Sequence, residues 1–266
     1  MIYPLAERCL IKISGVDAES FLQNLVTQDV ARQQPEKLVY ACLLTPQGRF
    51  LHDLFIFREG DDFFLDCETQ RREDLIRRLQ IFKLRSKVVI EDCSSAFSVY
   101  AGSQGRFRDP RLEALGYRSY PPAGETVAEA GSAVAYKEMR IHLGVPEGSL
   151  DIKPEGDTMA DVNLDMLHAV SWTKGCFVGQ EVAARMENRG LVKKRMVIVS
   201  GRGLVAGGEL TQDGHAVGEV RSVNAAGTEG LAILKLAALE DKTGAIMQSD
   251  SRITARLPNW FKLDNT

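Results

Sequence analysis

The chain contains the segment Lys174-Gly175-Cys176-Phe177-Val178-Gly179-Gln180-Glu181, in which a cation, a thiol, an amide and a carboxylate lie around two glycines. Glycine permits sharp turns and close backbone approach. Good helix formers follow Gly179, so we expect a helix to begin there and Cys176 to precede its N-terminus. We call residues 174–181 the signature segment.

Two interpretations of Cys176 follow from the residues around it. Free helix amides, the helix dipole and Lys174 would all lower the pKa of the thiol and favour the reactive thiolate. A free cysteine is also among the most often buried residue types, and Phe177 and Val178 are apolar neighbours. On this chemistry alone, a reactive thiolate and a core cysteine remain equal alternatives.

The signature segment resembles the Lys-Gly-Cys-aromatic-any-Gly-Gln-Glu motif of the YgfZ-type folate-binding proteins, and all eight positions fit. These bacterial relatives of the glycine-cleavage T-protein support the assembly and repair of iron-sulfur clusters. Further blocks similar to the family cover nearly the whole chain, and they begin at Ile13, Phe21, Leu43, Lys83, Asp109, Leu115 and Gly218.

The resemblance implies an α+β fold, with two interleaved α+β lobes around a central cavity for tetrahydrofolate or a derivative and a small C-terminal β-barrel. It implies iron-sulfur client proteins or assembly factors as partners, including radical enzymes that thiolate tRNA. Cys176 and Lys174 would be the reactive residues. The residues expected to contact folate are Trp172, Gly175, Phe177, Gly179, Gln180, Glu181, Arg185, Gln47 and Asp53.

The alternative function is a folate-dependent aminomethyl or other one-carbon transferase, with Glu73, Asp74 or Asp53 as general base. T-proteins have an asparagine-alanine pair before the corresponding aspartate, and residues 66–74 lack that pair. Their Arg-Thr-Gly-Tyr-Thr-Gly-Glu block has no counterpart in residues 97–146. Both departures favour the cluster-repair branch, and whether the protein is an enzyme stays open.

Composition describes a globular chain of 266 residues with 44% hydrophobic residues and a formal net charge of −3, which points to no partner class. The N-terminus lacks a basic segment leading into an apolar stretch, and no apolar run is long enough to cross a bilayer. We therefore expect a cytoplasmic protein without a membrane partner. Five widely spaced cysteines disfavour a disulfide scaffold, a zinc site and a permanently bound cluster.

Two basic runs stand out, at residues 70–87 and 185–195. Arginine forks there would match the carboxylates of a folate tail, phosphates or RNA. Only Phe82 supplies an aromatic ring for base stacking within these runs, which disfavours direct nucleic-acid binding. A scaffold whose basic surface binds RNA or a protein is the third candidate function.

Hydrophobic periodicity predicts the order of the elements. Helices are expected from Ala18, with Asp17 as N-cap, and over residues 70–82 and 132–142, whereas residues 102–131 read as a surface connection. We expect a T-protein-like region over residues 1–190 and a β-barrel domain over 191–266. The predicted strands are residues 9–13, 38–43, 51–57, 63–66, 88–90, 196–200, 218–223, 231–236 and 252–257.

Overall fold

The computed structural model describes residues 1–31, 36–125, 127, 131–188, 192–241 and 243–262. The alternating segments of the first half form a five-stranded antiparallel sheet with the order β3-β4-β5-β2-β6. All five predicted strands are present. Their bounds are β2 (Arg8–Ser14), β3 (Val39–Leu44), β4 (Phe50–Glu59), β5 (Asp62–Glu68) and β6 (Val89–Asp92).

Two helices bury their apolar residues in one cluster with this sheet: α1 (Ala18–Leu25) and α2 (Arg72–Lys83). The first turn predicted for α2 is instead the 3-10 helix η1 (Thr69–Arg71). Asp17 occupies the N-cap position of α1, but its carboxylate accepts a hydrogen bond from the Lys87 amide at 2.7 Å. The predicted side-chain cap is therefore replaced by a bond to the loop before β6.

A second, four-stranded sheet corrects the prediction of a plain surface connection over residues 102–131. Its strands are too short for alternation to reveal them. Because β1 pairs with β7, about a hundred residues later, the two lobes are interleaved. The sheet has the order β1 (Ile2–Pro4), β7 (Tyr100–Gly102), β9 (Tyr117–Ser119) and β8 (Phe107–Arg108), with η2 (Glu113–Leu115) before β9 and α3 (Ala133–Leu143) after it.

The C-terminal strands close into a barrel, as predicted, because β10 pairs with both β13 and β15. Asp213 and Gly214 form the two-residue turn of the β11–β12 hairpin, both with positive φ. The predicted domain boundary at residues 190 and 191 lies outside the described residues. The barrel consists of β10 (Lys194–Ser200), β11 (Glu209–Gln212), β12 (His215–Val223), β13 (Glu229–Lys235), β14 (Ile246–Gln248) and β15 (Ser251–Arg256), with α6 (Leu236–Glu240).

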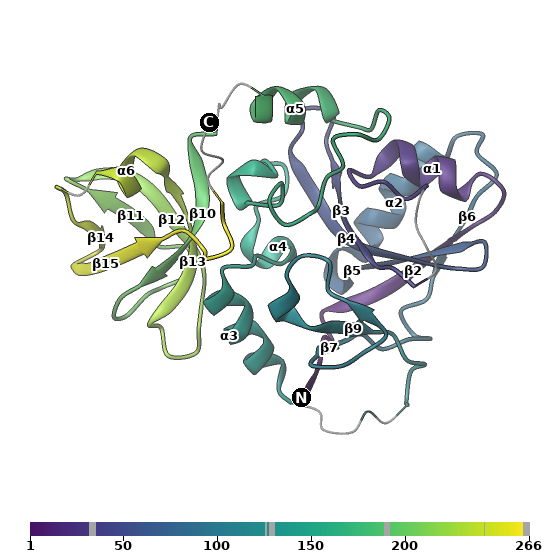
Figure 1. Cartoon of the computed structure of the whole chain (residues 1–266), viewed down its shortest axis with the longest axis horizontal. Helices are drawn as coiled ribbons and strands as arrows, with labels where there is room; N and C mark the ends of the chain where they lie inside the picture. The colour runs from purple at the N-terminus through teal and green to yellow at the C-terminus, as the bar shows by residue number, and fades with distance from the viewer. Residues whose placement is uncertain (32–35, 126, 128–130, 189–191, 242, 263–266) are drawn as a thin grey trace.

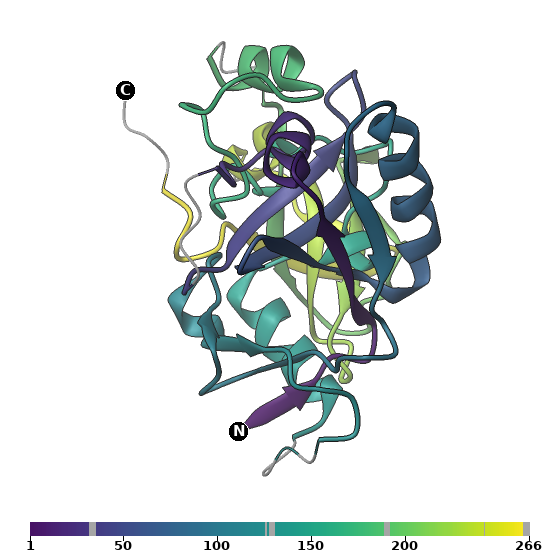
Figure 2. The same cartoon turned by 90° about the vertical axis from the view of Figure 1, so that its right-hand side faces the viewer.

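Short helices occupy the space where the two lobes and the barrel meet. Figure 1 shows α4 (Gly148–Asp151) at the centre and α5 (Gln180–Asn188) at the top, above the end of β3; η3 (Ala160–Val162) lies between them in the chain. Figure 2 shows the first sheet in front of the barrel. The main core joins both lobes to the barrel strands β10 and β13.

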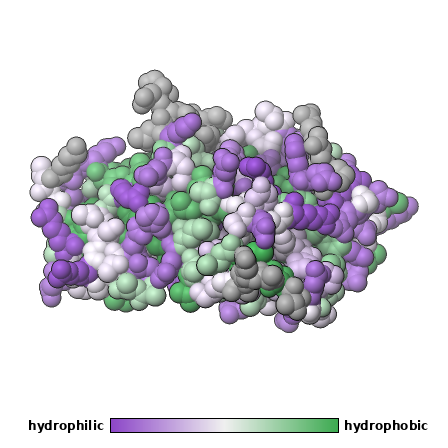
Figure 3. All heavy atoms as spheres, turned by 60° about the horizontal axis from the view of Figure 1, so that its bottom comes forward, coloured by the Kyte–Doolittle hydropathy of each residue, from purple (hydrophilic) through white to green (hydrophobic). Residues whose placement is uncertain are grey.

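The surface mixes polar and apolar side chains. On the face in Figure 3, hydrophilic residues are interspersed with smaller apolar areas, in keeping with 33 basic and 36 acidic residues in the chain. Among the described residues, no helix is long and apolar enough to cross a membrane.

Candidate functional site

The signature segment lies on an exposed loop that leads into α5, which begins at Gln180 as predicted. Gly179 has a φ of +82°, and a Cβ at this position would lie 2.5 Å from the carbonyl oxygen of Thr45, in the turn between β3 and β4. A Cβ on Gly175 would meet no heavy atom within 4 Å, and its φ is not positive. The two glycines therefore differ: Gly179 permits a close backbone approach, whereas Gly175 is not needed for one.

Lys174 binds the C-terminal end of α1. Its ammonium donates hydrogen bonds to the carbonyl oxygens of Gln23, Val26 and Gln28 at 2.8, 2.6 and 2.9 Å. These bonds use all three of its hydrogens. Burial lowers the pKa of Lys174 to about 8, with Asp29 opposing the shift, so the charged form prevails at pH 7. The structure thus gives this cation a capping role beside the role predicted toward Cys176.

Further hydrogen bonds tie the preceding loop to the same region. The Thr27 hydroxyl donates to the Ala169 carbonyl at 2.5 Å, and the Ser171 amide donates to the Thr27 carbonyl at 3.0 Å. The Gln28 side chain donates to the His168 carbonyl at 2.7 Å. These bonds fix the loop that precedes the signature segment to the residues that follow α1.

Cys176 faces solvent, whereas the other four cysteines are buried. Its neighbour Phe177 is only 6% exposed and belongs to the main core, with the Lys174 ammonium 5.5 Å from its ring centroid. The core interpretation therefore holds for the neighbouring Phe177 and not for Cys176. Phe177 is the core residue that anchors the loop, and Cys176 is accessible to reagents and partners.

The other residues expected around Cys176 lie mostly on the surface. Gln47 is exposed at the tip of the β3–β4 turn, and Trp172 is 40% exposed. The Glu181 carboxylate pairs with Arg185 at 2.9 Å along α5, and both side chains are exposed. Gln180 is partly buried. These residues form an open surface around the signature segment.

The cavity beneath this surface is small. It has a volume of about 10 Å³ and is lined by Trp172, Gly48, Met159 and Ala183, among others. Such a space holds about one water molecule, whereas ligand pockets usually measure about 300–1,000 Å³. This cavity beside Trp172 is smaller than a pteridine ring.

Asp53, the remaining predicted folate contact, lies elsewhere, in a network of buried charges between the lobes. Arg8 connects it to β5, with 2.8 Å to the Asp53 carboxylate and 2.6 Å to Asp66. Arg118, in the second lobe, reaches the other oxygen of Asp66 at 2.6 Å. The network comprises Arg8, Arg111, Arg118 and Arg140 with Asp53, Asp66, Asp109, Glu147 and Asp151.

The arginines of this network hold its acids in the charged form. Burial raises the pKa of Glu147, but Arg140 and Arg118 outweigh it, and the resulting pKa is about 2. For Asp53, burial likewise opposes Arg8, and the pKa ends below its ordinary value. A carboxylate with a lowered pKa is a weak proton acceptor near neutral pH, so Asp53 is poorly suited as a general base.

Of the two other proposed bases, Glu73 is exposed on α2, and Asp74 is committed to ion pairs. It accepts hydrogen bonds from Arg78 at 2.8 Å and from Arg77, and lies 3.0 Å from the His52 ring nitrogen. Burial raises its pKa, but Arg78 prevails and brings it to about 2. Burial and Arg71 lower the pKa of His52 to about 4. At these pKa values, neither Asp74 nor His52 is an effective base at neutral pH, as a transferase would require.

The first basic run is largely neutralised by neighbouring acids. Arg77 and Arg78 pair with Asp74, Arg78 also reaches Glu155, and Arg72 pairs with Asp92 at 2.9 Å. Part of the second run, residues 189–191, lies outside the described residues. These arginines of α2 therefore have acidic partners within the protein.

Hydrogen-bonding groups of the kind expected to bind a folate lie at the centre of the molecule. A cavity of about 60 Å³ there is lined by Glu7, Arg8, Glu68, Glu147 and Ser149, among others. Carboxylates suit the amino-pyrimidine edge of a pterin, which presents N–H donors. The Ser149 amide and hydroxyl, however, donate to Glu68 at 2.8 and 2.5 Å. The residues fit a pterin chemically, whereas a volume of about 60 Å³ is smaller than such a ring requires.

Among the described residues, no cluster of three or more histidine, cysteine, aspartate or glutamate side chains is placed to hold a metal ion.

Comparison with known proteins places this architecture. The model of the GCVT N-terminal domain matches residues 8–102, and that of the CAF17 C-terminal beta-barrel domain matches residues 193–263. The mitochondrial iron-sulfur cluster assembly factor IBA57 of Mus musculus is 30% identical over 97% of this chain and 85% of its own length. The chain belongs to the IBA57 family.

Other relatives of the family extend the comparison. The IBA57 homolog of Mycosarcoma maydis is 35% identical over 73% of this chain, and the match covers 55% of that protein. The chain thus spans about half the length of such fungal relatives. Glycine cleavage system aminomethyltransferase T from Bartonella henselae shares the fold, with a TM-score of 0.77 at 15% identity over 98% of this chain and 86% of that one. The predicted T-protein-like α+β fold with a terminal barrel is confirmed.

The prediction of a cytoplasmic protein is corrected by these relatives. The IBA57 proteins of mouse and of the fungi are described as mitochondrial. The prediction rested on the absence of a recognisable leader, which is a weak criterion when the compartment is set by the organism and by segments outside the fold.

Sequence reasoning missed the buried network that Asp53 belongs to. Arg111 and Arg118 stand in the blocks Asp109-Pro110-Arg111 and Leu115-Gly116-Tyr117-Arg118, which were noted only as similar to the family. Arginine and aspartate are almost never fully buried unless they are paired, so sequence alone offered no reason to place these residues in the interior. The partners, Asp66 and Glu147, are too distant in sequence to be assigned without the fold.

Proposed function

We propose that this protein is an accessory factor for the assembly or repair of iron-sulfur clusters in client enzymes, of the YgfZ type, with tRNA-thiolating radical enzymes among its clients. The observation that supports this role is an exposed thiol, Cys176, on a loop fixed by Lys174 and Phe177. The relatives described as iron-sulfur cluster assembly factors support the same process.

Cysteine thiolates are the usual ligands of iron-sulfur clusters, and a complete set normally has four. Cys176 supplies one such ligand from the surface, so the partner must contribute the others. Its contact with a cluster is therefore transient and shared, or it captures an electrophile released during repair. Gln47, Trp172 and Glu181 form the exposed surroundings that a client would meet.

The test is complementation of a strain that lacks this gene, read out as the activity of a cluster-dependent enzyme. We expect Cys176→Ala to lose most of the complementing activity while the purified variant melts like the parent. Cys42→Ala, which removes a buried thiol, is the matched control and should complement. Full activity with Cys176→Ala would refute the proposed role of this thiol.

For the cofactor, we propose that tetrahydrofolate or a derivative binds at the centre, with its pterin edge held by Glu68 and Glu147, once α4 has moved away from Glu68. The GCVT-type fold supports this proposal. No chemical step is assigned to the folate. This chain's own contribution is to bind and orient the ring and to exclude water with Leu150 and Ser149, which line the same cavity.

Calorimetric titrations of two variants with tetrahydrofolate test two things separately: the Glu68 carboxylate as a ligand, and the Ser149 hydrogen bond that occupies it. Ser149→Ala removes the 2.5 Å hydroxyl bond that keeps Glu68 occupied, so it should bind several-fold more tightly than the parent. Glu68→Ala removes a ligand group and should bind at least tenfold more weakly. Equal affinities in all three proteins would place the folate elsewhere or exclude it.

A further inference from the structure

Two buried cysteines lie opposite each other on neighbouring strands of the first sheet. Cys9 on β2 and Cys67 on β5 are directly opposite in the antiparallel register, and their sulfur atoms lie 3.8 Å apart. Both side chains belong to the apolar cluster under α1 and α2. They are independent of Cys176 and have no part in the function proposed above.

The strand geometry suits a covalent link between them. Residues directly opposite in an antiparallel pair have Cα atoms about 4.5 or 5.5 Å apart, within the range of about 4.4–6.8 Å seen in disulfides. A disulfide requires the sulfur atoms to move from 3.8 Å to about 2.05 Å apart. The register places the two thiols opposite each other for this bond.

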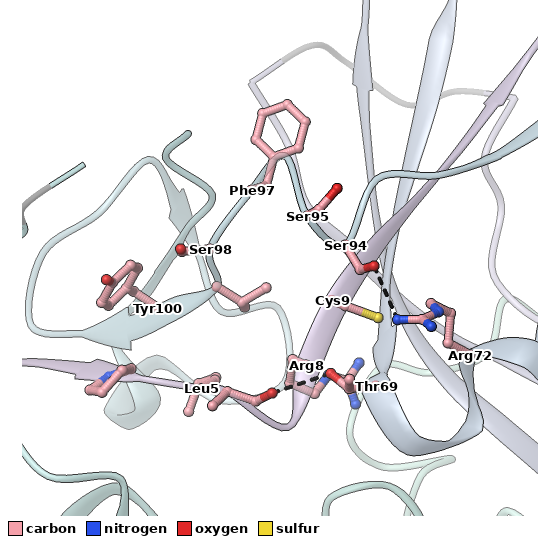
Figure 4. Close-up of a pocket in the computed structure, with 13 residues that line it drawn as sticks. Leu5, Arg8, Cys9, Thr69, Arg72, Ser94, Ser95, Phe97, Ser98 and Tyr100 are labelled. Carbon is pink, nitrogen blue, oxygen red and sulfur yellow. Dashed lines mark hydrogen bonds between the residues drawn. The ribbon is translucent and has the colours of Figure 1, made fainter. Parts of the chain in front are cut away.

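A cavity of about 410 Å³ gives small molecules access to Cys9. It opens at the junction of the two lobes, and Arg72, Thr69, Ser94 and Phe97 line it together with Cys9. Figure 4 shows the Cys9 sulfur directed toward the Arg72 guanidinium, which donates to the Ser94 hydroxyl at 3.0 Å. The lining is polar on the side of the thiol, so water and small polar oxidants can reach it.

The surroundings distinguish the two thiols. A hydrogen bond with Cys67, another with Thr69 and the charge of Arg72 lower the pKa of Cys9 despite its burial. The same contact with Cys9, together with burial, raises the pKa of Cys67 well above its ordinary value. Of the two thiols, Cys9 lines the cavity and Cys67 does not, so a small molecule in the cavity meets Cys9 first.

We propose that Cys9 and Cys67 form a dithiol redox site that reacts with a small peroxide from the lobe-junction cavity and closes to a disulfide. The Cys9 thiolate attacks one peroxide oxygen and the O–O bond breaks, leaving a sulfenic acid on Cys9 and a hydroxide that takes up a proton. The Cys67 sulfur then attacks the Cys9 sulfur, the S–O bond breaks, and the second water leaves with the Cys67 proton. Two thiols lose two electrons in total, and hydrogen peroxide is reduced to two waters.

The link would affect the centre of the molecule through the next residues in each strand. Arg8 precedes Cys9 and Asp66 precedes Cys67, and their side chains form the 2.6 Å ion pair of the buried network. A disulfide would fix the two strands that position this pair. We therefore expect the oxidised protein to melt at a higher temperature than the reduced one.

The experiment uses the full chain with Cys176→Ala, which removes the exposed thiol and leaves four of the five cysteines. After hydrogen peroxide and quenching, thiols are counted in denaturant and peptides are mapped without reductant. The expected result is a loss of two thiols and a tryptic cross-link between residues 9–12 and 59–71, both reversed by dithiothreitol.

Two further variants make the result specific. Cys42→Ala in the same background removes another buried cysteine and should still lose two thiols and form the same cross-link. Cys67→Ser removes the second thiol, so Cys9 should remain as a sulfenic acid that dimedone labels. Retention of all four thiols at peroxide concentrations that oxidise free cysteine would overturn the proposal, as would a sulfenic acid on Cys9 without a cross-link when Cys67 is present.

Discussion

Lys174 and Cys176 lie two residues apart and have opposite relations to solvent. The lysine ammonium is used up by three backbone carbonyls at the end of α1, and the cysteine thiol is exposed. A short motif therefore combines one residue that builds the loop with one that the loop presents. Variants at the two positions should fail in different ways.

We expect Lys174→Met to destabilise the protein by about 2 kcal/mol or more, because the buried Val26 carbonyl and the partly buried carbonyls of Gln23 and Gln28 lose a charged donor. Cys176→Ala should leave the free energy of unfolding within about 0.5 kcal/mol of the parent, as is usual for exposed positions. Urea unfolding at pH 7 measures both. Equal stability of the two variants would show that the lysine does not anchor the loop.

At the level of elements, α5 and the β3–β4 turn meet at glycines. Gly48 in the turn has a φ of +73°, and a Cβ there would lie 3.0 Å from the Val182 Cβ on α5. Gly179 approaches the same turn from the other side. The position of the signature segment depends on this contact as well as on Lys174.

Gly179→Ala should cost about 1–3 kcal/mol, because it adds a Cβ 2.5 Å from the Thr45 carbonyl oxygen at a positive φ. It should also speed the reaction of Cys176 with a thiol reagent, since the loop loses its close contact with the β3–β4 turn. Gly175→Ala is the matched control, with open space around its Cβ, and should change neither quantity. If both substitutions are tolerated alike, the glycine contact does not position the loop.

Elements were predictable from sequence where a strand or helix was long enough for its period to show. The five strands of the first sheet, the helices α1 and α3 and the barrel strands β10, β12, β13 and β15 follow from apolar spacing and turn residues, whereas the short strands β11 and β14 were not predicted. The strands of the second sheet have two or three residues each, which is less than the alternation needs. The 3-10 turn before α2 reflects local packing that a periodic pattern does not encode.

The candidate site was predictable only in part, for the same reason. The signature segment is contiguous, so its residues could be named from sequence. Asp53 was assigned to the same site, but the fold places it beside Arg8 in the interior. Contacts between residues such as Arg118 and Asp66 depend on how the two lobes interleave, and no local pattern specifies that.

For the whole molecule, the buried network makes stability depend on acid pH. Glu147 has a pKa of about 2 in the fold, from an ordinary value of 4.5. Because the folded-state pKa is the lower one, its contribution is complete above pH 4.5 and is lost as the pH falls toward 2. The difference corresponds to about 3 kcal/mol.

We therefore expect the free energy of unfolding, measured in urea, to fall steeply between about pH 4.5 and pH 2.5. Glu147→Gln should be less stable at pH 7, because Arg118 and Arg140 lose a charged partner. Its stability should also change less over this acid range. A parent protein with constant stability from pH 5 to pH 3 would contradict the assignment of Glu147.

The same network limits how the sequence of this interior can change in evolution. Arg8, Arg118 and Arg140 each pair with two or more carboxylates, and Asp66 pairs with arginines from both lobes. Losing one member leaves an unmatched charge away from water, which costs about 3–5 kcal/mol, a large fraction of the roughly 5–15 kcal/mol that stabilises a typical domain. Substitutions here are expected to arise in compensating sets, so lineages should keep the whole group or exchange several members together.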